Sequence, residues 1–247
     1  MKIASENDPL SAWLNVNLDD PNAVLAKALE LYHPAITLAC SFSIEDAAIV
    51  DMLMKIRKDA RVFALDTGRL NPETYECAEQ LRRRYKVQIE WFFPKHEAVE
   101  KLERSKGVFS FKQSVEERKE CCGIRKVEPL NRALSGMNAW ITGLRREQSV
   151  TRSDLKVVEI DASHSGILKI NPLAAWSLDD VWKYTRENYV PYNPLYDVGY
   201  TSIGCAPCTR AIQPGEDQRA GRWWWENPEH KECGLHLPTM KTFHPSI

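Results

Sequence analysis

The chain has 247 residues, of which 43% are hydrophobic and 27% are charged. These proportions are typical of a globular protein and exclude a wholly disordered or collagen-like chain. The 33 Lys and Arg residues nearly balance the 34 Asp and Glu residues, which argues against a general nucleic-acid-binding protein. No apolar run approaches the roughly 18 to 20 residues of a membrane-spanning helix, and the first residues lack the apolar core of a secretory signal. We therefore expect a cytoplasmic protein with neither nucleic acid nor membrane as a partner.

Short apolar segments alternate with longer amphipathic segments from about residue 35 onward. The first of them is apolar throughout, as expected for a strand that is buried on both faces of a parallel sheet. The repeated order of strand and helix predicts right-handed crossovers and a parallel sheet. Predicted strands cover 35–42, 61–66, 87–94 and 138–145, with a weaker pair at 157–162 and 167–173, and predicted helices cover 44–56, about 72–86 and 177–189.

The predicted fold class is α/β, an open and mostly parallel twisted sheet flanked by helices, with an irregular C-terminal segment. Asn71 stands immediately before Pro72 and is the predicted N-cap of the second helix. We expect one structural domain in three parts. They are an N-terminal helical segment (1–34), the α/β part (35–210) and a C-terminal segment (211–247).

Polar segments follow three of the predicted strands, at 41–46, 66–69 and 143–146. In open α/β sheets, ligands bind beyond the carboxyl ends of the strands. Hydroxyl groups, backbone N–H groups and guanidinium groups in these segments suit an anionic ligand. The sequence therefore predicts one anion-binding pocket at this edge of the sheet.

Four of the seven cysteines form two close pairs, Cys121 with Cys122 and Cys205 with Cys208. A thioredoxin-type redox pair is expected at the start of a helix, whereas Cys205 lies among Gly and Pro residues. Adjacent cysteines do not easily supply two tetrahedral ligands to one zinc ion. An iron–sulfur cluster offers a separate iron atom to each thiolate. The pattern favours such a cluster, and four structural thiols remain the open alternative.

The remaining cysteines fall into two classes. Cys40 and Cys77 lie on a predicted buried strand and a predicted amphipathic helix, and we interpret both as small hydrophobic residues. Cys233 stands near the C-terminus, with Arg219, Arg222 and His236 nearby in sequence. Cationic surroundings lower a thiol pKa from roughly 8.5 and make the thiolate available. Cys233 is therefore the candidate nucleophile.

Residues 121–134 have a helical pattern, and Lys126 follows Cys122 by four residues. This spacing places Lys126 one helical turn from the cysteine, on the same face. We expect its charge to offset that of thiolate and sulfide.

Seven segments spread over about residues 35 to 240 carry a recognisable pattern. They are SFSIEDAAIVD (41–51), LDTGRLNPETY (65–75), CCGIRKVEPL (121–130), WITGLRREQSVTR (140–152), INPLAAW (170–176), PYNPLYDVGYTSIGCAPCT (191–209) and ECGLH (232–236). Through these segments the chain resembles the assimilatory adenylylsulfate (APS) reductases, the iron–sulfur branch of the phosphoadenylylsulfate (PAPS) reductase family. ECGLH alone would not separate the two substrates; the four additional cysteines mark the branch that uses APS.

The resemblance implies a fold of the adenine nucleotide alpha hydrolase type. It implies that one [4Fe–4S] cluster is held by Cys121, Cys122, Cys205 and Cys208. It also implies that Cys233 attacks the sulfur of APS, forming an S-sulfocysteine and releasing AMP, after which thioredoxin or a similar dithiol frees sulfite. A homo-oligomer is implied as well.

The resemblance also implies that the segment 41–46 takes the place of the pyrophosphate-binding loop of related enzymes. Phe42 and Ile44 depart from the glycine-rich version of that loop, which argues against ATP as the substrate. The strand-end argument and the resemblance together assign the substrate-binding residues Ser41, Phe42, Ser43, Asp66, Thr67, Gly68, Gly143, Arg145, Arg152, Arg219, Arg222 and His236.

Three alternatives stay open. The first is reduction of PAPS, or of both APS and PAPS. The second is an ATP-dependent adenylating or tRNA-thiolating enzyme with the same type of sheet. The third is a binding module stabilised by zinc, without inorganic sulfide.

Overall fold

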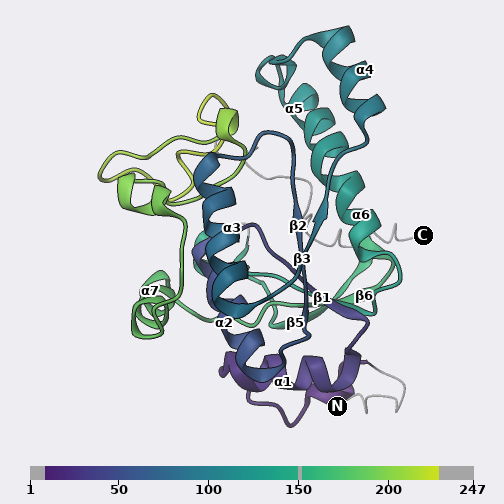
Figure 1. The fold of residues 1–247 in the computed structure, drawn as a ribbon, viewed down its shortest axis with the longest axis vertical. Helices are drawn as coiled ribbons and strands as arrows, with labels where there is room; N and C mark the ends of the chain where they lie inside the picture. Colours follow the sequence, from purple (N-terminus) through teal and green to yellow (C-terminus); the bar gives the residue numbers. More distant parts are fainter. Residues whose placement is uncertain (1–8, 150–151, 228–247) are drawn as a thin grey trace, which may run out of the picture.

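A six-stranded sheet with the order β3-β2-β1-β4-β6-β5 forms the centre of the protein (Figure 1). The structure is a computed structural model that describes residues 9–149 and 152–227. The first five strands in this order pair in parallel, and β5 runs antiparallel to β6 at the edge. The predicted mostly parallel sheet is therefore confirmed. The strands are β1 (Ile36–Ala39), β2 (Arg61–Leu65), β3 (Ile89–Phe92), β4 (Ala139–Ile141), β5 (Val158–Asp161) and β6 (Ile167–Ile170).

Helices cover both faces of the sheet. Side chains of α1 and α2 pack on one face, and α6 packs on the other face, against Phe63 of β2 and Trp140 of β4. None of the helices in the described part of the chain is long and apolar enough to cross a membrane. The α-helices are α1 (Pro21–Tyr32), α2 (Ile44–Ile56), α3 (Pro72–Tyr85), α4 (His96–Lys106), α5 (Val115–Cys122), α6 (Glu128–Leu134) and α7 (Leu178–Glu187).

The helix predicted over residues 121–134 is divided into three pieces. It begins as the end of α5, continues as a π-helical turn (Gly123–Val127) and ends as α6. Pro129 accounts for this division, because it has no backbone N–H to donate to the preceding turn. The N–H of Glu128 instead reaches back to the carbonyl oxygen of Gly123. The predicted helix is thus α-helical at its two ends, and Lys126 lies in the π-helical turn between them.

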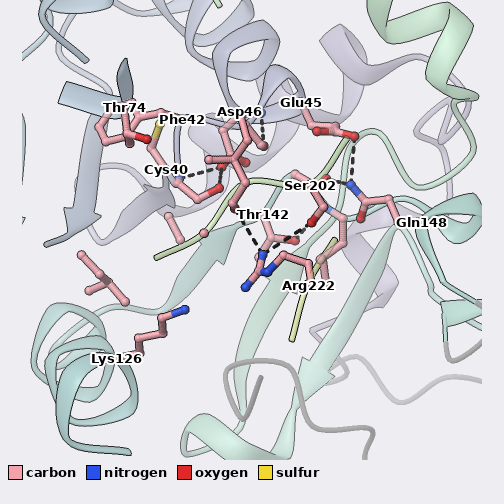
Figure 2. Close-up of a pocket in the computed structure, with 18 of the residues that line it drawn as sticks. Cys40, Phe42, Glu45, Asp46, Thr74, Lys126, Thr142, Gln148, Ser202 and Arg222 are labelled. Carbon is pink, nitrogen blue, oxygen red and sulfur yellow. Dashed lines mark hydrogen bonds between the residues drawn. The ribbon is translucent and has the colours of Figure 1, made fainter. Parts of the chain in front are cut away.

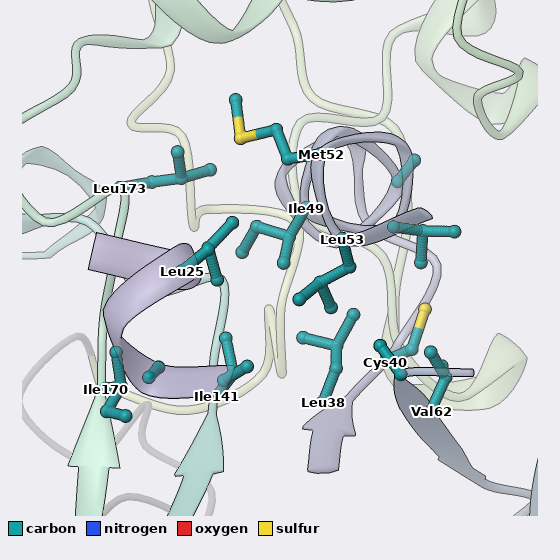
Figure 3. Packing of buried hydrophobic residues seen from close by; sticks show 14 of the residues in the cluster. Leu25, Leu38, Cys40, Ile49, Met52, Leu53, Val62, Ile141, Ile170 and Leu173 are labelled. Atoms are coloured by element: carbon teal, nitrogen blue, oxygen red, sulfur yellow. The ribbon is translucent and has the colours of Figure 1, made fainter. Parts of the chain in front are cut away.

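Buried apolar side chains fill the space between the sheet and helices α1 and α2 (Figure 3). Leu38, Ile141 and Ile170 of the sheet meet Leu25 of α1 and Ile49 of α2, and each of these side chains is at most 1% exposed. Burying one such side chain is worth about 1.5–3 kcal/mol. This packing holds the strands, and therefore the loops at their carboxyl ends, in fixed positions.

The N-termini of α2 and α3 are held differently. Ser43 caps α2, because its side chain accepts a hydrogen bond from the N–H of Asp46. Asn71 occupies the predicted N-cap position of α3, but its side chain makes no capping hydrogen bond. It donates instead to the carbonyl oxygen of Gly204, at 3.3 Å. Asn71 thus ties α3 to the loop that carries Cys205.

Candidate active site

A cavity of about 230 Å³ opens at the carboxyl ends of β1, β2 and β4 (Figure 2). The chain runs from β1 outward to β2 and β3 and then returns to β4 on the other side of β1. Such a change of direction is where open α/β sheets bind ligands. Residues assigned from the sequence that line the cavity are Ser41, Phe42, Ser43, Thr67, Lys126, Gly143, Arg145, Arg152, Cys205, Arg219 and Arg222.

Two further assigned residues are not part of the described lining. The carboxylate of Asp66 accepts hydrogen bonds from the N–H of Gly68, at 2.7 Å, and from the hydroxyl of Tyr75, at 2.9 Å. Gly68 has a φ of +72°, a conformation that side-chain-bearing residues rarely adopt. In this structure both residues shape the turn beside the cavity. Cys233 and His236 lie outside the described residues.

The loop after β1 is held by a buried carboxylate. One oxygen of Asp46 accepts hydrogen bonds from both the N–H and the hydroxyl of Ser41, each at 2.6 Å. Phe42 between them has a φ of +61°, in the left-handed region. Burial raises the pKa of Asp46 to about 6, although the hydrogen bonds from Ser41 act to lower it. The loop therefore presents Ser41 and the N-terminus of α2 to the cavity.

Gly143 is required by the close approach of this carboxylate. A Cβ atom at position 143 would collide with Oδ1 of Asp46 and would lie 3.0 Å from Cβ of Glu45. No side chain fits in that space without moving the loop. Gly143 thus allows the loop after β4 to pack against the loop after β1.

Arg145 lies in the cavity wall with its charge already paired. Its Nε and Nη2 atoms each lie 2.9 Å from Oε1 of Glu45, and the two side chains are 1% and 6% exposed. Gln148 donates to the same carboxylate oxygen and accepts a hydrogen bond from Arg152. Glu45 therefore binds Arg145 and Gln148 directly and is linked to Arg152 through Gln148.

The two cysteine pairs come together on the opposite side of the cavity. Cys121 and Cys122 end α5, and Cys205 and Cys208 flank one short 3₁₀ turn. Cys121 and Cys208 pack in one apolar cluster with Phe111. We call these four thiols the cysteine cluster, and none of them forms a disulfide among the residues that the structure describes.

Cationic and polar groups surround the thiol of Cys205. Burial acts to raise the pKa of this thiol, but Lys126, a hydrogen bond with Thr67 at 3.2 Å, Arg222 and Arg125 together lower it. For Cys208, burial and the neighbouring Cys205 outweigh the nearby cations and raise the pKa to about 12. Lys126, expected beside Cys122, acts to lower the pKa of Cys205, Cys208 and Cys121.

Arg222 reaches across the cavity toward Lys126 (Figure 2). Its Nη1 atom donates to the carbonyl oxygen of Ile203, at 3.2 Å, and to the hydroxyl of Ser202, at 3.4 Å. The Nε atom is buried and has no hydrogen-bond partner among the described residues. The guanidinium group packs directly on Gly204, where a Cβ atom would lie 2.6 Å from it. A second cation therefore faces the cavity close to Cys205.

The cysteine cluster supplies four thiols, the donor type that binds iron–sulfur clusters. Within the described ranges, no group of three or more His, Cys, Asp or Glu side chains is placed to hold a single ion. The thiols are nonetheless close enough to influence one another, since Cys205 raises the pKa of Cys121, and both Cys205 and Cys122 raise that of Cys208. In an iron–sulfur cluster, each thiolate binds its own iron atom, and neighbouring cations compensate the negative charge. The donor set and its surroundings fit such a group.

Several residues of the site were missed in the sequence. Glu45 lies inside the segment 41–46, yet nothing local indicates that it pairs with Arg145, one hundred residues later. Arg125 binds the carbonyl oxygen of Thr67 and a carboxylate oxygen of Glu103. The available signal was the basic pair next to the first cysteine pair, of which only Lys126 was selected.

Comparison with known proteins gives a consistent result. A family model described as the phosphoadenosine phosphosulfate reductase domain matches residues 35–211. The adenosine 5'-phosphosulfate reductase of Allochromatium vinosum is 51% identical over 217 residues, which cover 86% of this chain and 84% of the relative. The adenosine 5'-phosphosulfate reductase of Burkholderia cepacia is 48% identical over 231 residues, which cover 94% and 92% of the two chains.

A solved structure supports the same assignment. The phosphoadenylyl-sulfate (PAPS) reductase of Candida auris, crystallised as a phosphate complex, superimposes with a TM-score of 0.66. It is 32% identical, and the match covers 78% of this chain and 90% of that one. The family resemblance expected from the sequence is confirmed.

Proposed function

Because the chain belongs to the phosphoadenosine phosphosulfate reductase family, we propose that it reduces adenosine 5'-phosphosulfate (APS) to sulfite and AMP. The electron donor is thioredoxin or a similar dithiol protein, and the reaction serves assimilatory sulfate reduction. One observation supports this most strongly. The cavity combines the loop after β1, at the N-terminus of α2, with a wall that carries Cys205 and the cations Lys126 and Arg222.

The proposed reaction has two steps. In the first, the thiolate of Cys233 attacks the sulfur of APS; a bond between Sγ and sulfur forms, the bond from sulfur to the bridging phosphate oxygen breaks, and AMP leaves. In the second, a donor thiolate attacks Sγ of Cys233 and sulfite leaves. The other donor thiol then frees Cys233, and the donor becomes a disulfide. The two electrons that convert sulfate to sulfite come from this dithiol.

The residues of the cavity oppose the repulsion between thiolate and substrate. Both reactants are anionic, and fixed cations in a site with little water lower such a barrier by a few kcal/mol. Lys126 and Arg222 line the cavity together with Arg219. The N-terminus of α2 adds backbone N–H groups and a favourable dipole. These groups would hold the phosphate and sulfate oxygens.

Arg145 has a different task in this proposal. Its guanidinium group is buried and bonded to Glu45, so much of its charge is compensated before the substrate binds. We assign it to holding the loop after β4 in shape. Arg152, Arg219, Arg222 and His236 remain the proposed contacts of phosphate or sulfate.

The cysteine cluster is the proposed site of one [4Fe–4S] cluster. Cys121, Cys122, Cys205 and Cys208 would be its ligands, and when bound it supplies local electrostatics rather than the electrons of the reaction. Lys126 both lines the cavity and acts on the thiol of Cys205. It would therefore balance the negative charge on both sides.

APS is the favoured substrate, and PAPS is the alternative. The two bacterial relatives described above are named for APS, whereas the fungal structure, at lower identity, is named for PAPS. The two substrates differ by one phosphate at the 3′ position of the ribose. An additional cation near the ribose would allow both to be used.

The proposal is tested by product analysis under anaerobic conditions. We expect the purified protein with thioredoxin to form sulfite and AMP in equal amounts from APS, and no product from ATP. Cys233→Ser should form neither, whereas Cys77→Ala, at a buried cysteine away from the cavity, should keep the activity. Sulfite formation by Cys233→Ser, or turnover of ATP in place of APS, would contradict the proposal. Equal rates with APS and PAPS would establish dual specificity.

Two further expectations accompany this function. A chain with free thiols and an iron–sulfur cluster suits a reducing compartment, so we propose a cytoplasmic location. The family resemblance also predicts a homo-oligomer, which analytical ultracentrifugation of the anaerobic protein would measure.

A further inference from the structure

Arg118 is a buried arginine that the reaction proposed above does not use. Its Nε atom lies 2.6 Å from Oε1 of Glu226, and the two side chains are only 1% and 5% exposed. Removing one partner from such a pair leaves an uncompensated buried charge. The pair therefore fixes the distance between the two segments that carry it.

One of those segments is the helix that bears the first cysteine pair. Arg118 precedes Cys121 by three residues and Cys122 by four within α5. Residues with this spacing lie on the same face of a helix. The ion pair is thus formed on the face of α5 that also carries the two thiols.

The other segment leads to Cys233. Glu226 stands seven residues before Cys233 in the sequence. The Arg118 guanidinium lies 4.4 Å from the ring centre of Trp223, and that of Arg222 lies 4.6 Å from the same ring. Cations over an indole ring add attraction and restrict its orientation. Arg118 therefore holds two residues of this segment at once.

The second cysteine pair is joined to the same place. The N–H of Trp223 donates to the carbonyl oxygen of Cys208, at 3.1 Å, and Thr209 forms an antiparallel bridge with Arg222. Residues 222–226 are consequently bonded to both segments that carry the cysteine pairs. Arg118 contributes the connection to the pair at 121–122.

We propose that Arg118 is a positioning residue. It fixes residues 223–226 to the helix that carries Cys121 and Cys122. Because residues 223–226 precede Cys233 in the chain, their position limits where Cys233 can meet the substrate. This inference rests on the proposed function, because it concerns how Cys233 meets the sulfur of APS. In this role Arg118 acts through Glu226 and Trp223. A displacement of about 1 Å is enough to slow a positioned reaction about 100-fold.

The test measures the first reaction step alone. Anaerobic protein with its full iron content is mixed with APS and no reductant, and the rate of mass gain on Cys233 is followed. We expect Arg118→Met and Glu226→Gln to slow this rate about 10- to 100-fold. Iron and sulfide content and the dissociation constant of AMP should stay unchanged.

A matched control and a structural readout separate positioning from general damage. Lys106 of α4 forms ion pairs with Glu117 and Glu120, which lie in α5 like Arg118. Lys106→Met breaks these pairs and should leave the rate of mass gain unchanged. Hydrogen exchange at the Trp223 amide should become faster in Arg118→Met and not in Lys106→Met. The double variant Arg118→Met with Glu226→Met, which removes both buried charges, should recover part of the rate.

The outcomes are distinguishable. Normal rates of mass gain in both Arg118→Met and Glu226→Gln would overturn the inference. If Arg118→Met loses iron, the test rests on Glu226→Gln, provided that this variant retains its iron. A normal rate of mass gain in Glu226→Gln would then overturn the inference. The absence of any mass gain in the unaltered protein contradicts the proposed function itself rather than the role of Arg118.

Discussion

Three buried cysteines have thiols that differ in acidity. Cys77 lies in α3, whereas Cys40 and Cys205 both line the cavity, after β1 and in the loop before the 3₁₀ turn at 206–208. Burial and the nearby charge of Asp46 raise the pKa of Cys40 well above its ordinary value and that of Cys77 to about 12. At Cys205, Lys126 and its neighbours outweigh burial and lower the pKa. The charges around Cys205, and not a difference in burial, therefore distinguish its thiol from those of Cys40 and Cys77.

Replacing one cysteine of each kind should give the largest contrast. Cys205→Ser removes a proposed thiolate ligand, so we expect loss of most iron and sulfide and a fall in sulfite formation of at least about 100-fold. Cys77→Ala removes only a buried sulfur atom and should keep both, with a stability cost of about 1–2 kcal/mol. Iron and acid-labile sulfide analysis beside the sulfite assay measures this. Full iron content in Cys205→Ser would show that Cys205 is not a ligand of the cluster and would contradict the difference proposed between Cys205 and Cys77.

Asp46→Asn tests the charge next to Cys40 and Cys77. The pKa of Asp46 is raised from 3.8 to about 6 in the folded protein, so the folded state binds a proton more tightly than the unfolded state. The resulting stabilisation is complete below about pH 4 and is lost as the pH rises through about 6, a difference of ~3 kcal/mol.

Asn carries no charge and removes this dependence. We therefore expect the unfolding free energy of Asp46→Asn, relative to the unaltered protein, to rise by up to ~3 kcal/mol between about pH 4 and pH 8. Denaturant unfolding at several pH values measures the difference, with the exposed Asp59→Asn as the control. A difference that does not change with pH would show that Asp46 titrates normally.

Lys126→Met tests the charge next to Cys205. We expect kcat/KM for APS to fall about 10- to 100-fold, because a cation between the substrate and the cysteine cluster is lost. The iron content should remain, since Lys126 is not a ligand. The control is Lys101→Met at an exposed position of α4, which should have no effect. Unchanged kcat/KM in Lys126→Met would show that the charge of Lys126 does not contribute to the reaction.

The strands and most helices follow from the sequence because their signals are local. The apolar run at 35–42 and the amphipathic run at 44–56 contain β1 and α2. The antiparallel direction of β5 was not specified by its pattern, since an edge strand pairs in either direction with similar residues. The π-helical turn depends on Pro129, which acts on a turn that lies before it in the chain.

The site was less accessible to prediction because its energetics are tertiary. The segments 41–46 and 143–146 were placed at one edge by strand order, and the structure brings them to one cavity. That Arg145 is neutralised by Glu45, or that Thr67 binds Cys205, depends on contacts between residues about one hundred or more positions apart. Residue type and spacing carry no information on such pairings.

The division of the seven cysteines into core residues, cluster ligands and one nucleophile is the central claim. It is tested by the intact mass and peptide map of anaerobic protein incubated with APS in the absence of reductant. We predict one added sulfonate, located on Cys233 and absent from Cys233→Ser, while the other six cysteines stay unmodified. A sulfonate on Cys205 or Cys40, or none in protein that retains its iron and sulfide, would contradict the account.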